Sequence, residues 1–167
     1  MVGSPVAWSP AGTTGTGRSS RGAACRRARD GRVAAGTPLV LVGHELPGVP
    51  APTVRADNHE GVRAAVALLA GHGHRRVAFA GFVGAGDIAE RRDAYLDAVR
   101  THGLDGGGDL VLEIADNHES GGVEAADRWL AGLDASAVVL GTDRNATGLL
   151  QRLRETGRTV PGDVAVG

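Results

Sequence analysis

The amino-acid sequence predicts an α/β fold in which a parallel sheet forms the middle of three layers. Short apolar runs rich in Val, Ala and Leu recur along the chain, and an amphipathic run of about 12–15 residues follows each of them. Strands that alternate with helices form right-handed βαβ units, so the strands lie parallel and helices cover both faces. The expected strands are 76–80, 110–114 and 136–140, and the expected helices lie near 88–102, 119–132 and 144–156.

Shorter strands are expected on either side of this repeat. Residues 39–42 and 53–56 are apolar enough for two strands, and the proline-rich segment 45–52 between them predicts an extended loop. After the last helix, Pro-Gly precedes an apolar run at 164–166, which predicts a final strand. Because the sequence stops on that strand, we expect the domain to be cut short.

A helix is also expected directly after the second strand. Asp57 or Asn58 can serve as its N-cap, and Val62, Val66 and Leu69 recur at helical spacing. This pattern predicts a helix with one buried face.

Residues 71–81 end that helix, turn, and begin the first strand of the repeat. Gly71 and Gly73 can adopt positive φ, which suits a helix C-terminus. We interpret the turn as a hinge between two lobes, 37–73 and 74–167. Positive or protonatable groups lie beside the carbonyl end of the helix, where its dipole favours them: His72, His74, Arg75 and Arg76.

Residues 1–36 differ from the rest of the chain. They are rich in Gly, Ser, Thr, Ala and Arg and lack a sustained apolar period, which is typical of a disordered leader. The arginine cluster leaves a nucleic-acid arm open as an alternative, although no helix-turn-helix pattern accompanies it.

Composition excludes several function classes. The net charge of −1 gives no general attraction to nucleic acid or to an anionic membrane. The single cysteine, Cys25, excludes an internal disulfide. No apolar run is long enough to span a bilayer, and no secretion signal begins the chain. We therefore expect a cytoplasmic protein with no membrane partner.

Ligands of such sheets bind beyond the carboxyl ends of the strands. The string Ala-Asp-Asn-His-Glu occurs at two of these ends, at 56–60 and 115–119. Helix capping explains both copies, and a metal site is the alternative, but neither copy has a second histidine at helical spacing. The chain also lacks lysine, a glycine-rich nucleotide pattern and a catalytic set. We therefore expect no metal, no cofactor and no enzymatic activity.

Several segments in a consistent order resemble the effector-binding core of the lactose/galactose (LacI/GalR) repressor family. They include Leu-Leu-Ala-Gly-His-Gly-His-Arg-Arg-Val-Ala-Phe-Ala-Gly at 68–81 and Val-Pro-Gly-Asp-Val-Ala-Val-Gly at 160–167. The resemblance extends over about 37–167. Further segments that carry it are 38–42, 54–58 with Gly61, 90–95, 119–121, and 142–143 with 148–150.

The resemblance implies a type I periplasmic-binding-protein fold, whose two Rossmann-like lobes close on a small effector, a sugar or another small polar metabolite. In that frame, 37–73 is a partial first lobe and 74–167 is a truncated second lobe. The family's DNA-binding domain is expected to be absent from this chain, and family members form homodimers through both lobes. The same sensor fold also resembles domains fused to cyclic-dinucleotide synthesis domains in some actinobacterial signalling proteins, which leaves a different output open.

The resemblance also implies candidate ligand contacts. Arg91 stands at the arginine that bonds an effector hydroxyl or carboxylate, and Asp143 stands at the effector-contacting aspartate; a surface arginine and an N-cap are the alternatives. Asp116 replaces an aromatic residue that stacks on the ligand in several relatives, which suggests a more polar effector. Asp57 and Glu60 are expected at the border of the cleft, with capping as their alternative.

Overall fold

The computed structural model describes residues 38–43, 50–84 and 86–167, which belong to two compact units. Of these residues, 38–41 and 50–52 belong to the first unit, and 42–43, 53–84 and 86–167 belong to the second. The predicted leader at 1–36 and most of the predicted loop at 45–52 lie outside the described residues.

Strands β1 (Leu41–Val42) and β2 (Thr53–Val54) form a two-stranded sheet. The Leu41 amide donates to the carbonyl of Pro52 at 2.8 Å, and the Gly43 amide donates to that of Val54 at 2.9 Å. From the first bond to the second, the residue number rises by two on each strand, so the two strands run parallel. Both strands are shorter than the sequence predicts.

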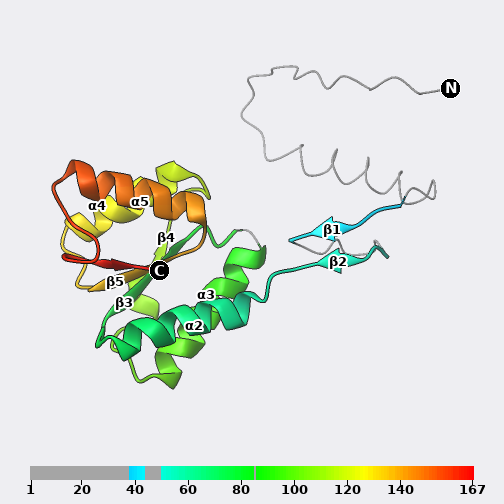
Figure 1. Cartoon of the computed structure of the whole chain (residues 1–167), viewed down its shortest axis with the longest axis horizontal. Coiled ribbons are helices and arrows are strands. Elements are labelled where there is room, and N and C mark those ends of the chain that lie inside the picture. The colour runs from blue at the N-terminus through cyan, green and yellow to red at the C-terminus, as the bar shows by residue number, and fades with distance from the viewer. Residues whose placement is uncertain (1–37, 44–49, 85) are drawn as a thin grey trace, which may run out of the picture. The chain divides into compact units, whose positions relative to one another are not determined.

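The second unit is built on a four-stranded parallel sheet. Its strands are β3 (Val77–Gly81), β4 (Val111–Glu113), β5 (Ala137–Leu140) and β6 (Ala165–Val166), in the order β4-β3-β5-β6. Phe79 lies opposite Val111 on one side and Val139 on the other. The predicted parallel sheet is confirmed (Figure 1).

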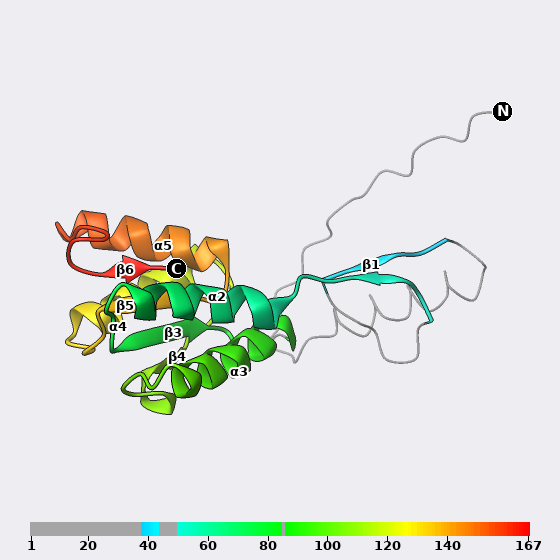
Figure 2. The same ribbon diagram turned by 60° about the horizontal axis from the view of Figure 1, so that its bottom comes forward.

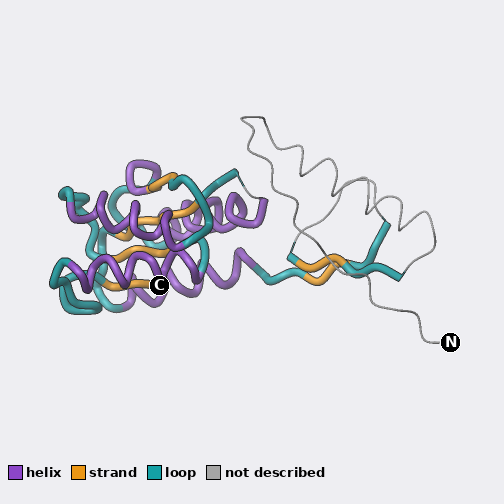
Figure 3. Tube along the Cα trace, turned by 90° about the horizontal axis from the view of Figure 1, so that it is seen from above, coloured by secondary structure: helices purple, strands orange, loops and turns teal. Residues whose placement is uncertain are grey.

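Helices cover both faces of this sheet, and α3 and α5 lie on opposite sides of the strands (Figure 2). Helices α2 and α3 pack against each other on one face, and α4 and α5 do so on the other. Figure 3 shows the short strands running between these longer helices. The helices are α2 (Asn58–Gly71), α3 (Gly86–Thr101), α4 (Glu119–Leu130) and α5 (Asp143–Glu155), with a 3₁₀ turn, η1, at Gly108–Leu110.

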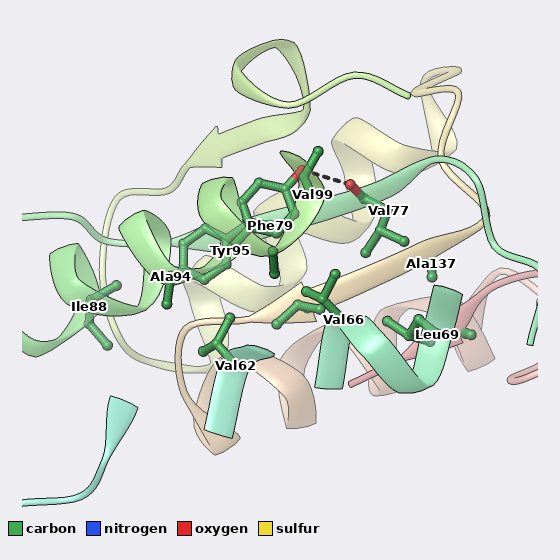
Figure 4. Close-up of a cluster of buried hydrophobic side chains, with 13 residues drawn as sticks. Val62, Val66, Leu69, Val77, Phe79, Ile88, Ala94, Tyr95, Val99 and Ala137 are labelled. Carbon is green, nitrogen blue, oxygen red and sulfur yellow. Dashed lines mark hydrogen bonds between the residues drawn. The ribbon is translucent and has the colours of Figure 1, made fainter. Parts of the chain in front are cut away.

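Alternation along β3 separates the core into two clusters. Val77 and Phe79 face α2 and α3, whereas Ala78 and Ala80 face α4 and α5. In the first cluster the Tyr95 hydroxyl donates to the Val77 carbonyl at 2.7 Å, and burial raises the pKa of Tyr95 to about 12 (Figure 4). The Tyr95 ring also packs on Phe79, with ring centroids 5.5 Å apart.

Helix α2 belongs to this core. Its Val62, Val66 and Leu69 lie in the first cluster together with residues of β3 and α3. The turn that follows α2 uses Gly73 at φ +91°, while Gly71 ends the helix. The division of the lobes at residue 73 stays a prediction, and within the second unit α2 packs with the strands that follow it.

Candidate functional site

A pocket of about 250 Å³ opens at the carboxyl end of β5, beside the start of α2. This is the edge at which parallel sheets bind ligands, because strand ends and helix starts converge there. Of the predicted site residues, Asp57 and Arg91 line this pocket. The complete lining is Ala56, Asp57, Asn58, Gly61, Val62, Ala65, Arg91, Val139, Leu140 and Gly167.

Arg91 is held by two neutral acceptors. Its Nε donates to Asn58 Oδ1 at 2.9 Å, and its Nη1 donates to the carbonyl of Gly141, just after β5, at 2.7 Å. Arg91 is half-buried and makes no ion pair with any residue that the structure describes. Its guanidinium is therefore anchored by two nitrogens and retains donor capacity on the third.

Asn58 and Glu90 complete the support of Arg91. Asn58 is only 8% exposed, and its Nδ2 donates to Glu90 Oε2 at 2.9 Å. Glu90 also forms an ion pair with Arg55. The hydrogen bond from Asn58, followed by that from Arg55, lowers the pKa of Glu90 below its usual value of 4.5.

Of the two N-cap candidates for α2, Asp57 takes the position, and Asn58 is the first residue of the helix. Oδ1 of Asp57 accepts from the amide of Glu60 at 2.9 Å, and the side chain also borders the pocket. Glu60 is exposed in the first turn of α2, 3.8 Å from Nη1 of Arg63, and does not line this pocket. Any contact of Asp57 or Glu60 with a ligand stays a prediction.

Asp116 organises the start of α4 from two residues before its N-cap. The helix begins at Glu119, and its N-cap, His118, makes no side-chain cap bond. Instead, Asp116 Oδ1 accepts from the amides of His118 at 2.8 Å and Gly121 at 3.2 Å. The bond from His118, followed by that from Ser120, lowers the pKa of Asp116. Capping therefore operates at both copies of the repeated string, with different spacing.

Asp143 is the first residue of α5 rather than its N-cap. Thr142 takes that position, and its Oγ1 accepts from the amide of Asn145 at 3.1 Å. Asp143 is exposed, and its carboxylate makes no hydrogen bond or ion pair within the described ranges. The capping alternative for Asp143 is thus wrong, and its role in ligand binding stays a prediction.

Asn145 joins the loops that carry Asp116 and Asp143. It is fully buried, and its Nδ2 donates to the carbonyls of Asp116 at 3.1 Å and His118 at 2.7 Å. Arg144 reinforces the contact through Nε and Nη2 bonds to Glu119, at 3.0 and 2.6 Å. The structure therefore brings Asp57 and Arg91 onto one pocket and ties the Asp116 and Asp143 loops to each other.

Asn58 and Asn145 help to build the site, although neither is among the residues predicted from the sequence to bind a ligand. Both continue a buried helical stripe by one turn: Asn58 precedes Val62 and Val66, and Asn145 precedes Leu149 and Leu153. A polar residue in register with a buried stripe needs internal hydrogen-bond partners. That register is the sequence signal that could have found them.

The carboxyls at this edge make folding stability sensitive to acid. The pKa values of Glu90, Asp116 and Glu119 are lowered in the folded chain, chiefly by hydrogen bonds from neighbours. A lowered folded pKa contributes stability that is fully present above the unfolded value and is lost as the pH falls through the folded value. We expect the urea midpoint to be constant from about pH 7 to about pH 5 and to fall below about pH 4.5.

Glu119→Gln removes one of these titrating groups, so its urea midpoint is expected to fall less steeply with acid than that of the wild type. A wild-type midpoint that rises in acid would contradict the assignment.

No cluster of three or more His, Cys, Asp or Glu side chains suited to a metal ion occurs within 38–43, 50–84 and 86–167. No helix in these ranges is long and apolar enough to cross a bilayer.

Known proteins share both the sequence pattern and the fold. Residues 66–166 match a family described as a periplasmic binding protein-like domain. The HTH-type transcriptional regulator CelR of Thermobifida fusca is 34% identical over 138 residues, which cover 79% of this chain and 40% of that protein.

Two solved structures extend the comparison. A transcriptional regulator of the LacI family from Sanguibacter keddieii is 38% identical with a TM-score of 0.69, covering 77% of this chain and 49% of that one. A sugar-binding transcriptional regulator of the LacI family from Escherichia coli, in complex with phosphate, is 28% identical with a TM-score of 0.67, covering 84% of this chain and 51% of that one. The chain thus spans about half or less of the length of these relatives.

Proposed function

This chain belongs to the periplasmic-binding-protein-like family, as part of the effector-binding domain of a LacI/GalR-type transcription regulator, and we propose that it binds a small polar effector in the pocket beside Arg91. The relatives named above are transcription regulators rather than enzymes. The absence of enzymatic activity in this chain stays a prediction.

The half-buried guanidinium of Arg91 carries this proposal. It lines the pocket, it is anchored by Asn58 and Gly141, and it has no carboxylate partner in the part of the chain that the structure describes. A guanidinium in this state favours a ligand with oxygen acceptors, such as a sugar hydroxyl, a carboxylate or a phosphate. The relative from Escherichia coli is described as sugar-binding and in complex with phosphate, and both ligands offer such acceptors.

Other contacts would come from the same edge of the sheet. Asp57 borders the pocket, and its carboxylate can accept a hydrogen bond from a ligand hydroxyl. Asp116 and Asp143 lie on the neighbouring loops. In the complete protein, we propose that ligand binding favours a closed arrangement of two lobes and that this change reaches a DNA-binding domain in a homodimer.

The test is a thermal-shift screen of the 167-residue chain with D-galactose, D-glucose, cellobiose, glucose 6-phosphate and inorganic phosphate. A ligand at about 100 times its Kd should raise the free energy of unfolding by about 2.7 kcal/mol. Arg91→Ala removes a charge-assisted donor, so we expect affinity to fall by at least about tenfold.

Arg63→Ala is the matched control, because Arg63 lies on α2 outside the pocket and is largely exposed. Its affinity should equal that of the wild type. A probe that binds equally well to Arg91→Ala, or a screen in which no probe binds, would contradict the proposal.

A further inference from the structure

Four side chains form a continuous row of polar contacts beside the pocket. Arg55 pairs with Glu90, Glu90 accepts from Asn58 Nδ2 at 2.9 Å, and Asn58 Oδ1 accepts from Arg91 Nε at 2.9 Å. The row ends at the carbonyl of Gly141, which accepts from Arg91 Nη1 at 2.7 Å. It therefore connects the segment after β2, the start of α2, helix α3 and the end of β5.

The middle of this row needs a side chain that donates and accepts at the same time. Arg91 donates and cannot accept, so its partner at position 58 must supply an acceptor. Glu90, as a carboxylate, accepts and cannot donate, so the same residue must also supply a donor. Asparagine provides both at once, and the opposite demands of Glu90 and Arg91 fix which way its amide points.

Burial makes this choice matter. Asn58 is only 8% exposed, so solvent has little access to replace either hydrogen bond. Arg91 lies on α3 and lines the pocket. Its side chain has several rotatable bonds, so without the hydrogen bond to Asn58 its guanidinium could turn away from this orientation.

We propose that Asn58 is the positioning residue that orients Arg91 toward the ligand pocket, and that Glu90 sets the direction of the Asn58 amide. This inference rests on the proposed function for the identity of the pocket, but the orientation of Arg91 is a property of the ligand-free protein. Asn58 acts through Arg91 and need not touch the ligand itself.

The test reads Arg91 directly, by NMR of the arginine Nε–H groups in the 167-residue chain without ligand. The Arg91 signal is the one that Arg91→Lys removes. Asn58→Leu keeps the branched shape of the side chain and deletes both hydrogen bonds, so exchange of the Arg91 Nε–H with water should become at least about tenfold faster. Arg144 provides an internal control, because its Nε donates to Glu119 at 3.0 Å and makes no hydrogen bond with Asn58. Exchange of the Arg144 Nε–H should therefore be the same in both proteins.

A second pair of variants separates positioning from general stability. Asn58→Asp places two carboxylates side by side and removes the donor to Glu90, whereas Asn58→Asp with Glu90→Gln restores one donor and one acceptor at each contact. We expect the single variant to weaken binding of the probe that gives the largest shift among D-galactose, cellobiose and inorganic phosphate, by at least about tenfold. Both variants place a carboxylate at position 58 beside Arg91, so they are compared with each other, and the double variant should bind the probe more tightly than the single variant. Simple damage to packing would not be reversed by a second substitution.

The exchange and binding measurements each decide whether Asn58 positions Arg91. Unchanged Arg91 Nε–H exchange in Asn58→Leu, or a double variant no better than the single one, would overturn the positioning role. If no probe binds even to the wild type, the proposed function fails, while the exchange measurement still decides whether Asn58 holds Arg91. If Asn58→Leu does not fold, Glu90→Gln serves as the second variant, because a glutamine at position 90 allows the Asn58 amide to flip by half a turn. Exchange of the Arg91 Nε–H should then be faster than in the wild type, and unchanged exchange would overturn the proposal.

Discussion

Gly122→Ala should lower the free energy of unfolding by about 2–4 kcal/mol, because α4 and α5 cross in direct backbone contact. A Cβ on Gly122 would stand 2.8 Å from the carbonyl carbon of Asn145 and closer still to its oxygen. The reciprocal position, Gly148 on α5, would place a Cβ 2.7 Å from the carbonyl carbon of Glu119. Neither obstacle is a flexible side chain, so the helices themselves must move apart.

Gly61→Ala is the matched control for this prediction. Gly61 lies within α2, and a Cβ there would meet nothing within 4 Å. The same chemical change should therefore stabilise the chain by up to about 1 kcal/mol through helix propensity. Urea denaturation of both variants measures the contrast, and a Gly122→Ala protein as stable as the wild type would show that the crossing is not this close.

The contrast between Gly122 and Gly61 also shows what sequence alone can predict. Strand and helix alternation depends on local apolar spacing, so the parallel sheet, its two covered faces and the cap at Asp57 follow from the sequence. Both glycines lie in predicted helices. Only the three-dimensional structure tells which of them faces another backbone.

In the candidate site, too, some residues follow from the sequence and others only from the three-dimensional structure. Arg91 enters as a candidate through its family resemblance, and the structure places it on a pocket with Asp57. The helical register of Asn58 with Val62 and Val66 marks it as a buried polar residue, but local patterns do not identify its partners, Glu90 and Arg91, which lie on α3 more than thirty residues away. Asp116 is similar: its carboxylate caps α4 from outside the usual position, and the sequence does not reveal that spacing.

Asn145→Asp is the second substitution with a large expected effect, and the effect depends on pH. The wild-type Nδ2 donates to the carbonyls of Asp116 and His118, and the side chain is fully buried. A carboxylate of the same size points an anion at both carbonyl oxygens. We expect a loss of about 3 kcal/mol or more in the free energy of unfolding near neutral pH.

The sign of the pH dependence follows from the folded pKa of the introduced carboxyl. Burial and the two facing carbonyls raise that pKa above the unfolded value of about 3.9. A raised folded pKa means that stability is fully present below the unfolded pKa and is lost as the pH rises through the folded pKa. The difference in free energy of unfolding between wild type and Asn145→Asp should therefore shrink in acid, because the protonated carboxyl can again donate to one carbonyl.

Urea denaturation of both proteins between about pH 7 and about pH 4 measures this difference. Subtracting the wild-type free energy of unfolding at each pH removes the loss of stability in acid that both proteins share through Glu90, Asp116 and Glu119. Asn145→Ala is the control: it lacks a titrating group, so its loss relative to the wild type should not change with pH. If the loss in Asn145→Asp were equally independent of pH, the Asn145 amide would not be what holds the Asp116 loop to the start of α5. If it shrinks as expected, the donation from the buried Asn145 amide to the carbonyls of Asp116 and His118 ties together the two loops at this edge of the sheet.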